Sequence, residues 1–170
     1  YGEIRLGEVV PAIAPPWPLE PSPVLAHART TGAADLYLET CYLPEPEAIT
    51  ADTLAPGAPL SVGFSWGHPW PAGAFHGLDG GRTPAAEDHL ARWIGLAARL
   101  GHPVMRITLG SPASRGTEPA AVLVDRLIAP TARAAERAAR VGLKLAIENH
   151  GDLRAEDLLE VLERVGSPDL

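Results

Sequence analysis

The chain has 170 residues, the usual size of one domain, and its 46% hydrophobic residues are enough to fill a core. A formal net charge of -7 and a pI near 5.3 exclude a basic surface for nucleic acid or anionic membranes. The single cysteine, Cys41, excludes an intramolecular disulfide, and no apolar run is long enough to cross a bilayer. We therefore expect a soluble, cytoplasmic protein with neither nucleic-acid nor membrane partners.

The first half of the chain predicts strands joined by proline-rich connections. Apolar, β-rich segments predict strands over Ile4–Val10, Asp35–Cys41 and Leu60–Trp66. Between the first two, Ser22-Pro23 has the pattern of a helix start, and Gly32 supplies the stop.

From Thr83 onward the alternation of helices and strands is regular. Thr83-Pro84 begins a helix that Gly101 ends, and a long alanine-rich helix is expected over about Glu118–Val141. Strands are predicted over Val104–Leu109 and Leu143–Glu148. Pro130 removes a backbone donor inside the long helix, which predicts a kink or a break near it.

The last predicted helix covers Ala155–Val165. Its apolar residues at helical spacing, Leu159 among them, are expected to face inward, and its charged residues, Asp157 among them, to form the solvated side. Residues 167–170 then lead out as if into a further strand.

Strands that alternate with helices predict βαβ units and a parallel sheet. The chain has no G-x-G-x-x-G after its first strand and no G-x-x-x-x-G-K-[ST] anywhere, so it lacks the usual nucleotide-binding motifs. The other common solution is a (β/α)₈ TIM barrel, which typically needs roughly 250 residues. We predict an α/β fold in which residues 1–170 form an incomplete N-terminal portion of a TIM barrel. This portion would hold about five βα units and would lack strands six to eight.

The segment "AIENHG" places polar residues directly after an apolar strand. In a parallel barrel, side chains at the carboxyl ends of the strands face the reaction mouth. The Glu148 carboxylate suits a hard cation such as Mg²⁺ or Mn²⁺, and an imidazole such as that of His150 is acceptable to Mn²⁺, Zn²⁺ or Co²⁺. The alternative is a polar turn in which Asn149 or Asp152 caps the next helix.

Three longer segments carry a resemblance to a known family: "ARWIGLAARLGHPVMRITLGS" (91–111), "ERAARVGLKLAIENHGD" (136–152) and "LLEVLERVGSPDL" (158–170). They resemble the xylose isomerase-like barrel family of sugar-phosphate isomerases and epimerases, which also includes inosose dehydratases and endonuclease IV-type repair enzymes. The match is good over residues 83–170 and loose over 1–82. The resemblance implies that Glu148 ligates a divalent metal ion (Mn²⁺, Mg²⁺, Co²⁺ or Zn²⁺). The family's remaining ligands lie on strands six to eight.

Other residues are predicted at the same rim. His68 follows the third strand beside Trp66, and aromatic faces pack on sugars, so both are candidate substrate contacts; structural packing is the alternative. Glu39 ends the second strand and either contacts substrate or pairs with Arg106, because an arginine inside a strand needs a partner. Asn149 and His150 either contact substrate or build the turn.

Together these observations predict a metal-dependent sugar or sugar-phosphate isomerase/epimerase. A divalent ion would polarise the substrate carbonyl, so that a neighbouring C–H proton can be removed, with Glu148 as metal ligand and catalytic carboxylate. An inosose-type dehydratase acting on a polyol ketone, or a non-catalytic truncated barrel that serves as a binding module, is the alternative. Without its last strands the chain alone is expected to be inactive, and its open sheet edge predicts a homo-oligomer.

Overall fold

The computed structural model describes residues 21–40, 43–50, 60–66, 83–110 and 117–170. Helices and strands alternate along the chain, as the sequence predicts. Their bounds are α1 (Pro21–Thr30), β1 (Asp35–Glu39), the short 3₁₀ helix η2 (Pro46–Ala48), β2 (Ser61–Trp66), α3 (Thr83–Leu100), β3 (Val104–Thr108), α5 (Ala120–Ala139), β4 (Lys144–Glu148) and α6 (Ala155–Val165). The strand predicted over Ile4–Val10 lies outside the described residues.

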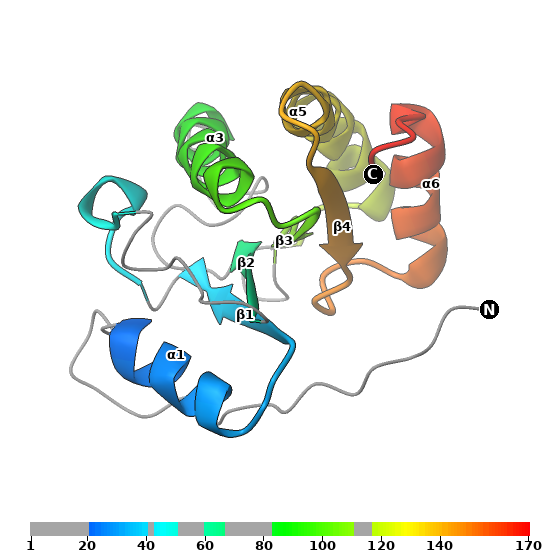
Figure 1. Ribbon diagram of the computed structural model, residues 1–170. Helices are drawn as coiled ribbons and strands as arrows, with labels where there is room; N and C mark the ends of the chain where they lie inside the picture. The colour runs from blue at the N-terminus through cyan, green and yellow to red at the C-terminus, as the bar shows by residue number, and fades with distance from the viewer. Residues whose placement is uncertain (1–20, 41–42, 51–59, 67–82, 111–116) are drawn as a thin grey trace.

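The strands form one parallel sheet in the order β1-β2-β3-β4, so each strand pairs with its neighbour in sequence (Figure 1). Helix α3 packs on β2 and on α5, and α5 packs in turn on β4 and on α6. This stepwise winding of βα units is that of a (β/α)₈ barrel, and the chain forms part of one. None of the helices in the described ranges is long and apolar enough to span a membrane.

The two faces of the sheet differ in character. One face is the hydrophobic core that packs against the helices, and its buried side chains are Leu36, Leu38, Val62, Phe64, Trp66, Met105, Ile107 and Leu145. The alternate residues of the same strands point the other way, and they include Tyr37, Gly63, Arg106 and Glu148. Because side chains alternate along a strand, this second face corresponds to the interior of the barrel.

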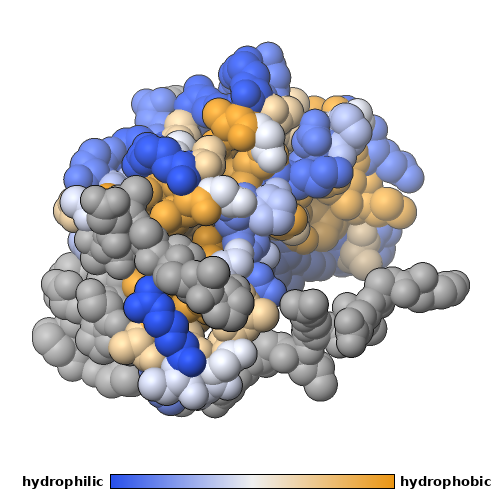
Figure 2. Space-filling model, viewed as in Figure 1, coloured by the Kyte–Doolittle hydropathy of each residue, from blue (hydrophilic) through white to orange (hydrophobic). Residues whose placement is uncertain are grey.

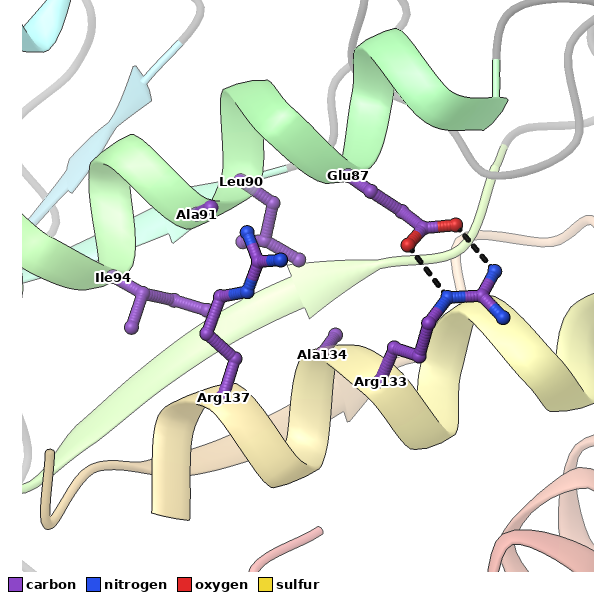
Figure 3. Close-up of a pocket in the computed structure, with 7 residues that line it drawn as sticks. All are labelled: Glu87, Leu90, Ala91, Ile94, Arg133, Ala134 and Arg137. Atoms are coloured by element: carbon purple, nitrogen blue, oxygen red, sulfur yellow. Dashed lines mark hydrogen bonds and ion pairs between the residues drawn. The ribbon is translucent and has the colours of Figure 1, made fainter. Parts of the chain in front are cut away.

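Hydrophilic side chains predominate over the outer surface of the helices, with hydrophobic patches visible between them (Figure 2). A shallow hollow lies between α3 and α5, with Leu90, Ala91, Ile94 and Ala134 as its apolar lining (Figure 3). Arg133 closes one end with a two-pronged ion pair to Glu87, at 2.8 and 2.6 Å. The hollow therefore belongs to the helix layer rather than to the polar face of the sheet.

Helix α6 departs from the sequence predictions, and helix α5 bears on the prediction for Pro130. Helix α5 continues through Pro130, so of the predicted kink or break the break is absent, and Pro130 is buried. In α6, Val161 is fully buried whereas Leu159 is 54% exposed, so the inward orientation predicted for Leu159 is wrong. Asp157 is also buried rather than solvated, because its carboxylate accepts the backbone N–H of Arg154 (3.2 Å) and caps the start of α6.

The end of the chain runs alongside β4. The backbone N–H of Leu145 donates to the carbonyl of Asp169 at 2.9 Å. The same kind of bond joins Lys144 to Pro103 at the start of the β3–β4 pair, also at 2.9 Å. The single bond of Leu145 to Asp169 links the end of the chain to the β4 edge, and residues 166–170 themselves form no strand.

Candidate functional site

Polar side chains from all four strands meet near the carboxyl ends of the strands, on the face opposite the helices. The register places Glu39 of β1 beside Ser65 of β2, and Ser65 beside Arg106 of β3. Glu148 of β4 pairs with Thr108, one alternate position beyond Arg106 and nearer the carboxyl rim. The side chains of Glu39, Ser65, Arg106 and Glu148, hereafter the Arg106 cluster, therefore project from the same face.

The guanidinium of Arg106 connects the other three side chains. Its Nη1 contacts the Glu148 carboxylate at 2.7 Å, its Nε donates to the Ser65 hydroxyl at 2.6 Å, and its Nη2 donates to the Glu39 carboxylate. The side chains of Arg106, Glu39 and Glu148 are each exposed by about a third, at 37%, 35% and 35%. The predicted pairing of Glu39 with Arg106 is confirmed.

The electrostatic balance of the cluster is negative. One guanidinium faces two carboxylates, so the group carries a net charge of minus one when all three are ionised. Within the described part of the chain, the only ion pair of the Glu148 side chain is that of Oε2 with Arg106. Its second oxygen is oriented by that ion pair and available to a ligand, which fits a carboxylate that binds a cation or accepts a proton.

The fit to a metal ion is limited to a single ligand. Glu148 offers the hard oxygen that Mg²⁺ or Mn²⁺ prefers. No group of three or more metal-ligating side chains occurs among the residues that the structure describes. Asn149, next in sequence, uses its side-chain oxygen to accept the backbone N–H of Gly151 at 3.1 Å. Among the described residues, Glu148 could therefore supply one ligand, and no set of side chains that would complete a metal site is present.

The remaining predicted site residues lie elsewhere. Asn149 bridges the turn after β4, because its amide nitrogen also donates to the Leu153 carbonyl at 2.9 Å, as expected of its alternative role in the turn. His150 is half-buried in the same turn. His68 lies outside the described residues.

The structure contradicts the substrate-binding role predicted for Trp66. Its side chain has no exposed surface and points into the helix layer, because Trp66 follows Ser65 and so occupies the opposite face of β2. The indole N–H donates to Nδ1 of His89 on α3 at 2.9 Å. Trp66 therefore packs between sheet and helix and is absent from the proposed site.

His89 is a partly buried polar residue at the centre of several contacts, which the sequence did not single out. Besides Trp66, the indole N–H of Trp93 approaches its Nε2 at 3.3 Å, and the carboxylate of Glu45 lies 3.6 Å from the same nitrogen. Burial lowers the pKa of His89 below its ordinary value of 6.5, Glu45 and Glu47 oppose that shift, and Arg92 adds to it. The only sequence signal for these contacts was that a histidine precedes a tryptophan by one turn (i, i+4) on an amphipathic helix.

The comparison with protein families agrees with the geometry. The model of the xylose isomerase-like TIM barrel family matches residues 61–170, well over half of the chain. No curated protein sequence matches the chain.

Solved structures match the chain over most of its length. A xylose isomerase domain protein from Planctomyces limnophilus is 20% identical, with a TM-score of 0.65, over 86% of this chain and 55% of that one. An L-ribulose 3-epimerase is 23% identical, with a TM-score of 0.62, over 86% and 52%. A xylose isomerase-like TIM barrel protein from Mycobacterium smegmatis, in complex with magnesium, is 14% identical, with a TM-score of 0.64, over 87% and 53%.

These similarities show the fold, and the chain spans about half the length of each of the three structures. The parallel sheet wound in sequence order, the polar rim at its carboxyl ends and the family match all point to the same conclusion. The chain belongs to the xylose isomerase-like TIM barrel family.

Proposed function

We propose that the protein is a metal-dependent isomerase or epimerase of a sugar or sugar phosphate, in which Glu148 is both a metal ligand and a proton-transfer group. The observation that carries the proposal is the position of Glu148. Its carboxylate lies at the carboxyl end of β4 on the barrel-interior face, with one oxygen fixed by Arg106 at 2.7 Å. Supporting analogies are the similarity to an L-ribulose 3-epimerase and to a relative in complex with magnesium.

A divalent cation, when bound, would polarise the substrate carbonyl and make the neighbouring C–H proton more acidic. The chain's own residues supply the remaining parts of the proposed mechanism. In the metal-free structure Arg106 holds the Glu148 carboxylate on the interior face. In the proposed reaction one oxygen of Glu148 binds the metal and the other accepts the proton from carbon. Return of that proton to the former carbonyl carbon, with transfer of the neighbouring hydroxyl proton to the former carbonyl oxygen, gives an isomer. If Glu148 keeps the proton and a second acid donates another to the opposite face of the same carbon, the product is an epimer.

Mn²⁺ titration calorimetry on the full-length protein tests the role of Glu148. Glu148→Gln keeps the size of the side chain and removes its negative charge, so we expect Mn²⁺ affinity to fall at least about tenfold, since even partners of metal ligands contribute about 10- to 100-fold. Glu163→Gln on the exposed side of α6 is the matched control and should bind as the wild type does. An unchanged affinity in Glu148→Gln would refute the proposed ligand.

The reaction products distinguish an isomerase or epimerase from a dehydratase. With Mn²⁺ and a panel of ketoses and ketose phosphates in D₂O, we expect NMR to show deuterium on the carbon next to the carbonyl, in products with the composition of the substrate. Loss of water from a polyol ketone would instead assign the dehydratase chemistry found on the same scaffold.

A further inference from the structure

We propose that Glu39 is a positioning residue, which acts as the permanent counterion of Arg106 and so allows Glu148 to turn to a metal ion. This inference rests on the proposed function of Glu148. It starts from one observation: a single guanidinium contacts two carboxylates that come from the two edges of the four-stranded sheet, Glu39 from β1 and Glu148 from β4.

The two carboxylates are not equivalent in depth. Glu39, Ser65 and Arg106 occupy one level of the sheet, since Glu39 pairs with Ser65 and Ser65 pairs with Arg106. Ala146 is the β4 residue at that level, and Glu148 lies two residues further along. Two residues advance a strand by about 6.6 Å. Glu148 therefore reaches back from the rim to Arg106, whereas Glu39 contacts it from the same level.

The charge balance explains why two carboxylates are useful. If Glu148 were the sole acidic partner of Arg106, its movement to a cation would leave a partly buried guanidinium without a counterion, which is unfavourable although its exposure of 37% reduces the cost. With Glu39 in place, Arg106 keeps one ion pair and the Ser65 hydrogen bond while Glu148 changes partners. Glu39 thereby lowers the free-energy cost of metal binding without touching the metal.

A direct metal contact by Glu39 is the competing explanation, and a double-mutant cycle separates the two. Mn²⁺ affinity is measured by calorimetry at 0.15 M salt for the full-length wild type, Glu39→Gln, Arg106→Gln and the double variant, with Glu163→Gln as control. We expect Glu39→Gln to weaken binding about 5- to 10-fold, and Arg106→Gln to strengthen it because the competing cation is gone. In the Arg106→Gln background, the effect of Glu39→Gln should shrink at least threefold.

Two further measurements exclude a purely structural role. Glu39→Asp keeps the counterion and should recover most of the lost affinity. Urea unfolding of the metal-free variants reports stability separately, and a merely structural Glu39 would lower stability while leaving the affinity of the folded protein unchanged. Arg106→Met provides a second background if Arg106→Gln does not fold.

The outcomes are distinct. Equal effects of Glu39→Gln in both Arg106 backgrounds, or no effect in the wild-type background, would overturn the positioning role even if Glu148→Gln abolishes binding. An unchanged affinity in Glu148→Gln would instead overturn the proposed function itself. Absence of Mn²⁺ binding by the wild-type protein would overturn both.

Discussion

At the scale of single residues, Arg106 organises the polar face of the sheet. An arginine in the middle of a strand must find partners, and the sequence offered Glu39 as the nearest candidate. The structure adds Glu148 and Ser65 to that pair. The additional contacts were not predictable from sequence alone, because they depend on the register that sets Glu39 and Ser65 level with Arg106 and Glu148 beyond it.

The alternation of side chains along β2 explains why the prediction for Trp66 was wrong. The segment SVGFSW is almost uniformly buried, so its burial pattern does not reveal which face each side chain occupies. Only the pairing of Ser65 with Arg106 shows that Ser65 faces the interior and Trp66 faces the helices. His89, which accepts the indole N–H of Trp66, could be recognised only after that face was known.

His89 makes the stability of the protein depend on pH. Because burial lowers its pKa in the folded state below 6.5, the unfolded chain takes up the proton first as the pH falls. The contribution of neutral His89 is therefore fully present above pH 6.5 and is lost progressively at lower pH. We expect the free energy of unfolding, measured in urea between pH 7.5 and 5, to decrease less in His89→Gln than in the wild type. Identical slopes for the two proteins would contradict this assignment.

At the scale of helices and strands, most boundaries were predictable from local chemistry. Helix α6 has the predicted bounds, and α3 begins at Thr83 and ends before Gly101 as expected. The wrong predictions concern which residues of α6 are buried. Leu159 and Val161 are apolar residues two positions apart, and the packing of α6 on α5 decides which one is buried. Pro130 is accommodated because the apolar face of α5 is buried on both sides of it, which favours an unbroken helix.

Alanine substitutions at two glycines, one inside helix α3 and one after helix α5, test the backbone conformation at each position. Gly142, after α5, has a left-handed backbone with φ of 73°, so an added Cβ is strained although no atom lies within 4 Å of it. Gly95 lies inside α3, where a Cβ would meet only the Arg99 guanidinium at 3.8 Å. The free energy of unfolding, measured in urea, should fall by about 1 kcal/mol in Gly142→Ala. It should rise by about 0.5–1 kcal/mol in Gly95→Ala. Effects of the same sign at both positions would contradict this backbone assignment.

At the scale of the whole molecule, the described sheet has two lateral edges, and Leu145 at the β4 edge donates a backbone hydrogen bond to Asp169, which lies in a turn. The chain spans about half the length of the relatives it matches. A barrel has no free edge when all its strands are present, whereas a partial one exposes unpaired backbone groups. We therefore propose that a longer chain with all eight strands is the folded unit.

Expression of two chain lengths tests this proposal. Residues 1–170 alone should self-associate with rising concentration in analytical ultracentrifugation and should unfold at lower urea than a chain that includes the remaining strands. A stable, monomeric protein of residues 1–170 would show that the open edge is already satisfied.

The central claim is that the Glu148 carboxylate faces the barrel interior at the rim where we propose that a metal ion binds. A crystal structure of the full-length protein grown with Mn²⁺ tests it most directly through the anomalous signal of the metal. We expect a peak at about 2.1 Å from a Glu148 carboxylate oxygen, close to the distance of Mg²⁺ to its oxygen ligands, with Arg106 still paired to Glu39. A Mn²⁺ ion bound elsewhere, with Glu148 outside its coordination sphere, would contradict the account.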